Sequence, residues 1–256
     1  MHKSARTIFC RFCGAAGAHR HGLDARRRAR FKCSHCARTF TGRTNTIRSG
    51  SHLGDDEWRN AARIFSLRAG MSGRDMARFF DWNEKTGQRL NRTFRTLVLP
   101  LMPRSIPGAS EWDESLPLRE QWVLGGVSRA TQSCRLQCIP DRSERILCPL
   151  VRSAVGAEGL VFTDEWGGYN DLYRRMTVCH AREFVNSQVR FVHTNTIEGV
   201  WGHLKPLGWH VYRGFPRSSL PQFLGEFMFR YNCRSYKNRV SILSALLSRK
   251  SHTLLV

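Results

Sequence analysis

Acidic residues are scarce in this sequence: 20 Asp and Glu stand against 41 Lys and Arg, which gives a formal net charge of +21. The deficit is greatest in residues 1–54, where Asp24 is the one acid beside twelve Lys and Arg. Such a surface attracts polyanions, because neutralising their phosphates releases counterions. The charge therefore predicts nucleic acid as a partner, with an anionic membrane surface as the alternative.

Long apolar runs are also lacking. No stretch of about 18 uncharged apolar residues occurs, so no transmembrane helix is expected. The start of the chain, "MHKSARTIFCRFC", has no apolar stretch of about 7–15 residues such as a secretory signal contains. The apolar content of 41% is sufficient for a globular core. We therefore expect an intracellular protein, with one large domain or two to three small ones.

Disulfide bonds are not expected either, because the nine cysteines are an odd number in a chain without a secretory signal. Four of them form two tight pairs, Cys10-x-x-Cys13 and Cys33-x-x-Cys36, separated by nineteen residues. Two such pairs can surround one Zn²⁺ with four thiolates in a tetrahedron. We predict one structural Zn²⁺ in a zinc ribbon over residues 1–50, with redox or chance cysteines as the alternative.

The ribbon needs a small core and offers a basic arm. The expected core residues beside the cysteines are Phe9, Phe12, Phe31 and Phe40. So few residues could not hold a fold without metal. The arginine-rich stretch between the pairs, "DARRRARFK", is expected to contact phosphates.

Short helices are predicted in the next segment. Between residues 55 and 99, apolar residues recur at the spacing of amphipathic helices. Gly70 is expected to end the first helix and Ser72 to cap the second. The expected inward residues are Trp58, Ala61, Ala62, Ile64, Phe65 and Leu67, then Met76, Ala77, Phe79 and Phe80, then Leu90, Phe94, Leu97 and Val98. Because the third helix is basic, we predict a helix-turn-helix-like DNA-binding module over 51–100, with a linker or dimerisation bundle as alternatives.

Strands are predicted beyond three prolines in residues 100–107, which mark a boundary. The expected elements are a hairpin of strands at 121–129 and 134–140, a helix at 142–155, a strand ending at Asp164 and another ending near His180. This order predicts a mixed α/β sheet.

Three acids of this last segment can be combined into a metal site: Asp113 in "SEWDES", Asp164 in "VFTDEW" and Glu198 in "NTIEGVW". The apolar run "LVF" leads to Asp164 at the end of a strand, where α/β sheets keep their sites. Three carboxylates can hold two divalent cations about 3.5–4 Å apart. A single carboxylate would bind Mg²⁺ weakly, because this ion prefers several hard oxygens.

The ordered set Asp113, Asp164 and Glu198, with 33 residues between the last two, resembles the DDE triad of transposases and retroviral integrases. More closely, the chain resembles the ISXO-type bacterial insertion-sequence transposases, a group related to the eukaryotic Merlin elements. The matching stretches are "TDEWGGYNDLY", "FVHTNTIEGVWGHLK" and "LGEFMFRYNCR". The ribbon, "FTGRTNTIRSGSHL" and the helices precede them in the family's order, so the resemblance covers nearly the whole chain.

The resemblance implies a ribonuclease-H-like catalytic domain over 109–247 that cuts and joins transposon ends. In this domain Asp113, Asp164 and Glu198 would hold Mg²⁺ or Mn²⁺, and Lys205, two helical turns beyond Glu198, would contact DNA. The implied partners are double-stranded DNA, as element terminal repeats and target, and further copies of the chain, but no membrane. The implied location is the cytoplasm in association with the nucleoid, or the nucleus of a eukaryotic host.

The first and third acids of this triad have alternative interpretations. The stretch "GASEWDESLP" has little β character, so Asp113 could lie in a surface loop and Glu111 or Glu114 could replace it. Glu198 could instead complete a capping box with Asn195, which is also a second candidate for the third position of the triad. For the whole chain, the alternatives are a DNA-binding regulator with a catalytically dead domain and a nuclease without strand transfer.

Other side chains of the last segment are expected in supporting roles. The stretch "EFMFRYNCR" (226–234) is expected as a helix that packs on the sheet and leaves its arginines free for phosphate. Trp201 is expected to anchor the core, and Glu165 to be solvated.

Overall fold

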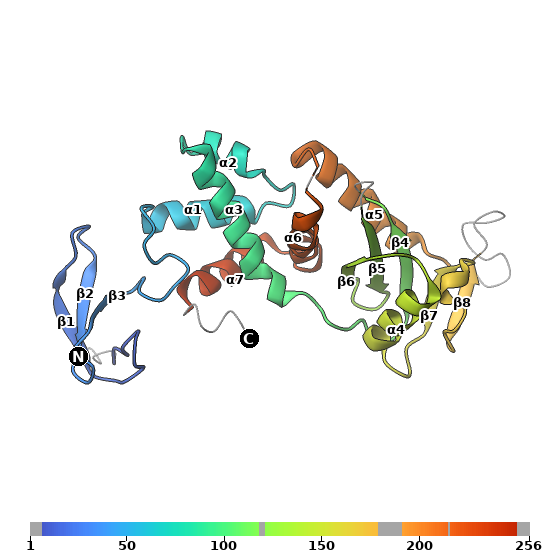
Figure 1. Cartoon of the computed structure of the whole chain (residues 1–256), viewed down its shortest axis with the longest axis horizontal. Helices are drawn as coiled ribbons and strands as arrows, with labels where there is room; N and C mark the ends of the chain where they lie inside the picture. The colour runs from blue at the N-terminus through green and yellow to red at the C-terminus, as the bar shows by residue number, and fades with distance from the viewer. Residues whose placement is uncertain (1–6, 118–120, 179–190, 215, 250–256) are drawn as a thin grey trace. The chain divides into compact units, whose positions relative to one another are not determined.

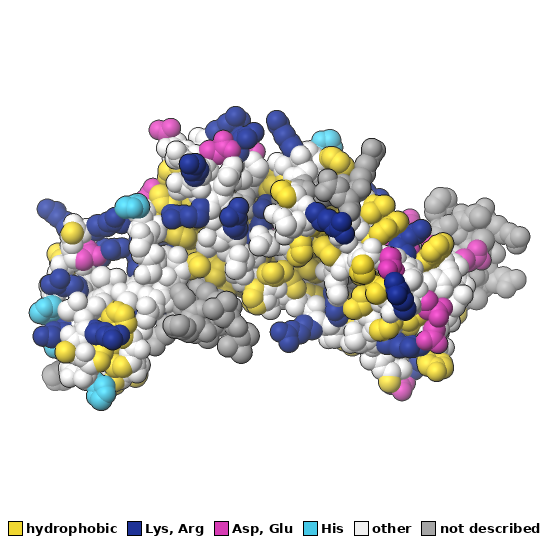
Figure 2. All heavy atoms as spheres, viewed as in Figure 1, with side chains coloured by type: hydrophobic (Ala, Val, Ile, Leu, Met, Phe, Trp, Pro, Cys, Tyr) yellow, Lys and Arg dark blue, Asp and Glu magenta, His cyan; other side chains and the backbone are white. Residues whose placement is uncertain are grey.

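The structure is a computed structural model that describes residues 7–117, 121–178, 191–214 and 216–249 (Figure 1). The chain divides into two compact units, one of Met1–Asn60 with Ser241–Val256 and one of Ala61–Val240. None of the described helices is long and apolar enough to cross a bilayer. On the face seen in Figure 2, Lys and Arg side chains are far more frequent than acids over strands β1–β3.

The first unit begins with a three-stranded antiparallel sheet in the order β1-β2-β3. Its strands are β1 (Ala18–Leu23), β2 (Ala29–Cys33) and β3 (Thr39–Thr41). Asp24 closes the turn between β1 and β2, because its carboxylate accepts the backbone N–H groups of Arg26 and Arg28 at 2.9 Å each. The arginine-rich stretch therefore forms a hairpin turn and the strand that follows it.

The small core of this unit differs in part from the prediction. Phe40 is buried and Phe31 is partly buried, as expected. Phe9 and Phe12 are 61% and 39% exposed, so the expectation that they are core residues is wrong. They lie next to the first cysteine pair, where a turn that directs two sulfurs inward leaves the neighbouring side chains facing outward.

Three helices follow, α1 (Asp55–Phe65), α2 (Gly73–Phe79) and α3 (Glu84–Val98). The Ser72 hydroxyl accepts the N–H of Asp75 at 3.1 Å, which confirms Ser72 as the cap of α2. Met76 and Ala77 are buried as expected, whereas Phe79 is 63% exposed. The α2–α3 contact runs through Ala77 and Gly87. Phe79 lies two residues, about 200°, around the helix from Ala77 and therefore points away from α3.

The second unit contains a five-stranded mixed sheet in the order β6-β5-β4-β7-β8. The strands are β4 (Ser110–Ser115), β5 (Trp122–Ser128), β6 (Cys134–Ile139), β7 (Val161–Asp164) and β8 (Arg175–Val178). β5 is antiparallel to β4 and β6, while β7 is parallel to β4 and β8. The predicted α/β sheet, its hairpin and the strand ending at Asp164 are confirmed. The expected strand end near His180 lies outside the described residues.

Asp113 lies on β4, the central strand of this sheet, and not in a surface loop. Every residue from Ser110 to Ser115 pairs with a residue of β5, and the first two also pair with β7. The low β propensity of "SEWDES" was misleading because pairing on both sides outweighs the preference of single residues.

Helices cover both faces of the sheet (Figure 1). On one face, α4 (Glu144–Val155) packs its Leu147 and Val151 against Trp112 and Leu124. On the other face lie α5 (Asn195–Pro206) and α6 (Leu220–Asn232), with a core that includes Trp201. The remaining helical segments are the 3-10 turns Leu99–Leu101, Gly167–Tyr169 and Arg217–Ser219, the π-helix Leu207–Val211, and α7 (Tyr236–Ser248).

A buried ion network joins α6 to α3. Glu226 is fully buried and pairs with Arg95 of α3 and with Arg230 one turn further along α6. Arg230 also donates to the carbonyl of Phe65 at 2.8 Å. The expectation that Arg230 is free for phosphate is therefore wrong, because its position on the inner side of α6 commits it to Glu226, whereas Arg234 is exposed.

Candidate active site

Asp113 and Asp164 lie side by side on adjacent parallel strands. β4 and β7 pair with Ser110 opposite Val161 and Glu111 opposite Phe162, and the same offset brings Asp113 alongside Asp164. Side chains at matching positions of neighbouring strands point to the same face of a sheet. Both carboxylates therefore point to the face that α5 covers.

The electrostatics of Asp113 reflect a cluster of acids. Its pKa is raised from 3.8 to about 6, chiefly because it is buried. The N–H groups of Trp201 and Glu114 counteract this rise, while the negative charges of Asp164 and Glu198 add to it. Asp164 and Glu198 are thus close enough in space for their charges to act on Asp113.

Trp201 of α5 holds Asp113 in place. Its indole N–H donates to Asp113 Oδ2 at 2.7 Å, and the ring is buried in the core. The strand beneath the ring makes room for it, because Gly125 lies opposite Asp113 on β5. A Cβ at Gly125 would lie 2.6 Å from the Trp201 ring, so only glycine fits there. The expected core anchor is thus also a hydrogen-bond donor to the candidate site.

The first turn of α5 is anchored by Glu111, two residues before Asp113 on the same face of β4. Glu111 is completely buried, and its Oε2 accepts the N–H groups of Thr196 at 2.8 Å and Ile197 at 3.1 Å. A carboxylate is favourable there because it meets the unpaired N–H groups and the positive end of the helix dipole. Glu111 therefore orients the helix that carries Glu198.

Arg129 completes this anchor. Its guanidinium donates to Glu111 Oε1 at 2.9 Å and to the carbonyl of His193 at 2.6 Å, just before α5. It also lies 3.6 Å from the centre of the Phe162 ring on β7. The charge of Glu111 is thus balanced by a neighbouring cation, as a buried carboxylate requires. Sequence reasoning missed this pair, although the shared face of Glu111 and Asp113 was a signal.

Glu198 lies half-buried in the first turn of α5. The hydroxyl of Thr194 donates to Glu198 Oε1 at 3.2 Å. Thr194 is the N-cap and Asn195 is already the first helical residue, so Asn195 is not the cap that the sequence predicted. Glu198 is consequently one residue too far along the helix for a capping box. Lys205 and Asn195 both lie exposed on α5.

The neighbours proposed as substitutes for Asp113 have other contacts. Glu111 is held by α5 and Arg129, while Glu114 points to the opposite face of the sheet. There Glu114 Oε2 accepts the Tyr169 hydroxyl at 2.5 Å and its Oε1 lies 3.4 Å from Arg142. Burial is the main cause that raises the pKa of Glu114 to about 7. Asp113 therefore remains the candidate for the first acid, and Glu165 is exposed as expected.

The four predicted zinc ligands converge at the base of the three-stranded sheet. Their sulfurs lie within 4.8 Å of one another, with 3.7 Å between Cys10 and Cys36 and between Cys13 and Cys33. Sulfurs about 2.3 Å from a tetrahedral zinc ion would be separated by about 3.8 Å. Backbone N–H groups of Phe12 and His35 donate to the first sulfur of each pair at 3.3 Å. The donor set and its spacing thus fit a structural Zn²⁺.

The acids are less tightly gathered than the cysteines. Within the part of the chain that the structure describes, the four cysteines are the one group of three or more ligands close enough to share an ion. Asp113 and Asp164 each accept an N–H, from Trp201 and from the backbone of Trp166 at 3.0 Å. Carboxylate oxygens are the ligands that Mg²⁺ takes, and a cation would offset the like charges around Asp113. The residue types thus fit a divalent cation.

Comparisons with known proteins converge on one family. Residues 117–232 match the family model of the ISXO2-like transposase domain. An uncharacterized transposase-like protein of Haemophilus influenzae is 25% identical over 115 residues, which cover 43% of this chain and 89% of that protein. Asp164 and Glu198 lie inside the matched range, and Asp113 lies four residues before it. The resemblance to the ISXO-type transposases is therefore confirmed, and the chain carries an ISXO2-like transposase domain.

Proposed function

We propose that this protein is a DDE transposase that binds the ends of an insertion sequence and catalyses metal-dependent DNA cleavage and strand transfer. The observation that carries the proposal is the alignment of Asp113 with Asp164 on adjacent strands, with the charge of Glu198 acting on Asp113. These acids come from two strands and a helix that are far apart in the sequence, which supports a site assembled by the tertiary fold. The comparisons do not favour the alternative of a regulator with a dead domain.

In this proposal Asp113, Asp164 and Glu198 hold Mg²⁺ or Mn²⁺. Such ions, when bound, activate the attacking water or 3′-hydroxyl and stabilise the leaving oxygen at the phosphodiester. The chain contributes the positioning of the carboxylates. Trp201 and Gly125 determine where Asp113 lies, and Glu111 orients the start of α5 below Glu198. Lys205, on the same side of α5 as Glu198 and exposed, would contact the DNA backbone.

The domain assignment belongs to the same proposal. A central β4 flanked by antiparallel β5 and parallel β7, with helices on both faces, supports a ribonuclease-H-like domain over residues 109–247. The zinc ribbon (1–50) and the helix-turn-helix-like module (51–100) would recognise the terminal repeats. Their excess of Lys and Arg supports this role. Joining two ends at one target calls for at least two copies of the chain.

Replacement of Asp164 tests the mechanism. Asp164→Asn should abolish Mg²⁺-dependent cleavage of DNA that carries the element's terminal repeats, and leave binding of that DNA unchanged. Glu165→Gln is the matched control, because this neighbouring acid is exposed and should be dispensable. Unchanged cleavage by Asp164→Asn would contradict the proposed mechanism. A wild-type protein that binds but never cuts DNA with Mg²⁺ or Mn²⁺ would instead favour the regulator.

A further inference from the structure

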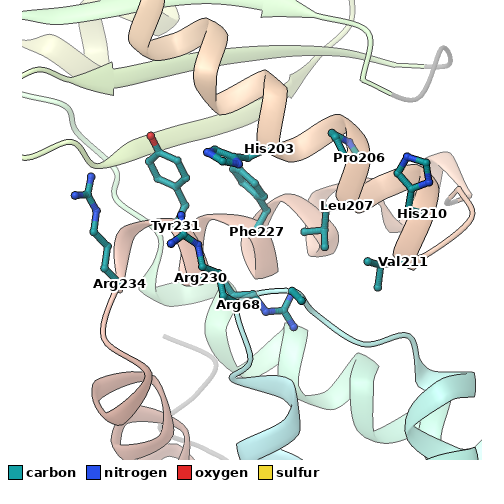
Figure 3. A pocket seen from close by; sticks show the side chains of 11 residues that line it. Arg68, His203, Pro206, Leu207, His210, Val211, Phe227, Arg230, Tyr231 and Arg234 are labelled. Carbon is teal, nitrogen blue, oxygen red and sulfur yellow. The ribbon is translucent and has the colours of Figure 1, made fainter.

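A cavity of about 560 Å³ lies within the second unit, beside α5 and α6 (Figure 3). One wall is formed by α5 and the π-helix that continues it, including His203, Leu207 and His210. Phe227 and Tyr231 of α6 form the facing wall, and Arg68 reaches in from the segment after α1 (Figure 3). The volume lies in the range of about 300–1,000 Å³ that is common for small-molecule sites.

The lining of the cavity is basic, and none of its eleven residues is an acid. Arg68 and Arg234 are exposed, and neither guanidinium has an ion pair with any described residue. Arg230 differs, because Glu226 neutralises it. Two unneutralised guanidinium groups in the lining of a cavity without acids attract an anion, and phosphate suits the guanidinium geometry.

The interior of the cavity is apolar and aromatic. The Tyr231 ring stacks on Phe227 with 5.7 Å between ring centres, and His203 lies 6.4 Å from it. Tyr231 is half-buried, and its hydroxyl has no hydrogen bond to any of the described residues. Burial raises the pKa of this phenol, while the positive charges of Arg234 and Arg68 lower it. Flat apolar surface thus lies next to cationic groups, which suits a ligand with an aromatic ring and a phosphate.

The cavity is close to the candidate active site along the chain. His203 follows Glu198 by five residues on α5, which is about 7.5 Å along the helix axis. His203 also lies about 140° around α5 from Glu198, so a DNA strand at the carboxylates would reach the cavity by passing over the side of the helix. A duplex is too wide to enter a space of 560 Å³, whereas one base with its phosphate fits.

We propose that this cavity binds one unpaired nucleotide of a DNA strand. The base packs against Tyr231 and Phe227, and the phosphate is bound by Arg68 and Arg234. This rests on the proposed function for its source of DNA, because cleavage near Glu198 would create a strand end that can unpair from its complement. Stacking on an aromatic ring tolerates any base, so the site would hold a strand without reading its sequence.

The test compares two DNA duplexes, one blunt and one with a four-nucleotide single-stranded extension that contains 2-aminopurine. Binding is measured by fluorescence without added divalent cation, so that the outcome does not depend on cleavage. Wild-type protein should bind the extended DNA at least fivefold more tightly and quench the 2-aminopurine. The double variant Arg68→Gln, Arg234→Gln should lose about tenfold in affinity for the extension and change less than twofold for the blunt duplex.

The matched control is the double variant Arg145→Gln, Arg174→Gln. It removes the same charge from exposed positions outside the cavity, one of them on α4. It should retain the preference for the extension.

The Tyr231 variants test the stacking surface. Tyr231→Leu, which keeps the volume apolar, should reduce the quenching, while Tyr231→Phe should retain it. The proposal is overturned if wild-type protein does not distinguish the two duplexes, or if the cavity variant weakens both equally. Competition by free dTMP at micromolar concentration would also overturn it, by indicating a mononucleotide site. Wild-type protein that prefers the extended DNA but does not cleave DNA when Mg²⁺ is added would refute the proposed function alone.

Discussion

The indole N–H of Trp201 on α5 donates to Asp113 Oδ2 on β4 at 2.7 Å. This contact joins the helix that carries Glu198 to the strand that lies beside Asp164. It exists because Gly125, opposite Asp113, leaves room for the ring. The position of the first acid therefore depends on a tryptophan 88 residues away.

Removal of this donor should change the pH dependence of cleavage. Trp201→Phe retains most of the buried ring but removes one of the two N–H groups that counteract the raised pKa of Asp113. A hydrogen bond to a charged group contributes about 1.5–3 kcal/mol, so the pKa should rise by about one unit or more. We expect cleavage at pH 7 to fall about twofold to fifteenfold, because less of Asp113 is ionised, and to recover as the pH is raised.

Trp209→Phe is the control for this variant, because Trp209 is 45% exposed and lies outside the candidate site. It should match the wild-type pH profile. A Trp201→Phe protein whose loss of cleavage is the same at every pH would argue for a packing role alone.

The pKa of Asp113 should also affect stability. Because it is raised from 3.8 to about 6 in the folded protein, protonation of Asp113 favours folding. This contribution is fully present below about pH 4 and is lost as the pH rises from about 4 to about 6. Without divalent cations, Asp113→Asn should therefore be more stable than wild type at pH 7, by up to about 3 kcal/mol in urea unfolding. The difference should vanish near pH 4, and a less stable variant at pH 7 would contradict the assignment.

A methyl group added at Gly125 should disturb the packing of Trp201 on β5. A Cβ there would lie 2.6 Å from Trp201, so Gly125→Ala should cost about 1–3 kcal/mol of unfolding free energy and reduce cleavage. Gly199→Ala on α5 is the matched control, because nothing lies within 4 Å of its Cβ position. Alanine should stabilise that helix by about 0.5–1 kcal/mol. Equal unfolding midpoints for the two variants would refute the close packing of Trp201 on β5.

Metal analysis should find about one zinc ion per chain. Four sulfurs at tetrahedral spacing, in a small core cluster of Cys10, Ala18, Cys33 and Phe40, indicate that the metal stabilises the fold. Cys33→Ser should lose the zinc and the cooperative unfolding of the first unit. Cys233→Ser, outside this cluster, should retain both. Purified protein with well under one zinc per chain that still unfolds cooperatively would rule out a structural metal.

Local sequence patterns are sufficient to predict much of the fold. The apolar stretches in "GLVF" and "QWVLGGVSR" predict β7 and β5, and Ser72 is predicted as a cap, because these features depend on residues a few positions apart. The stretch 226–234 was expected as a helix on the sheet and lies in α6 as far as Asn232, but Arg230 was expected at the surface. Its burial depends on Glu226 and on Phe65, which is 165 residues away. No local pattern contains that information.

The sequence by itself determined the cysteine pairs, the order of the acids and the resemblance to ISXO-type transposases, since each is a matter of residue type and spacing. Only the tertiary structure decided that "SEWDES" is a central strand, that Glu111 anchors α5 and that Asp113 aligns with Asp164. The physical reason is that strand pairing and burial bring distant residues together. Those contacts outweigh the weak local preferences of a polar stretch.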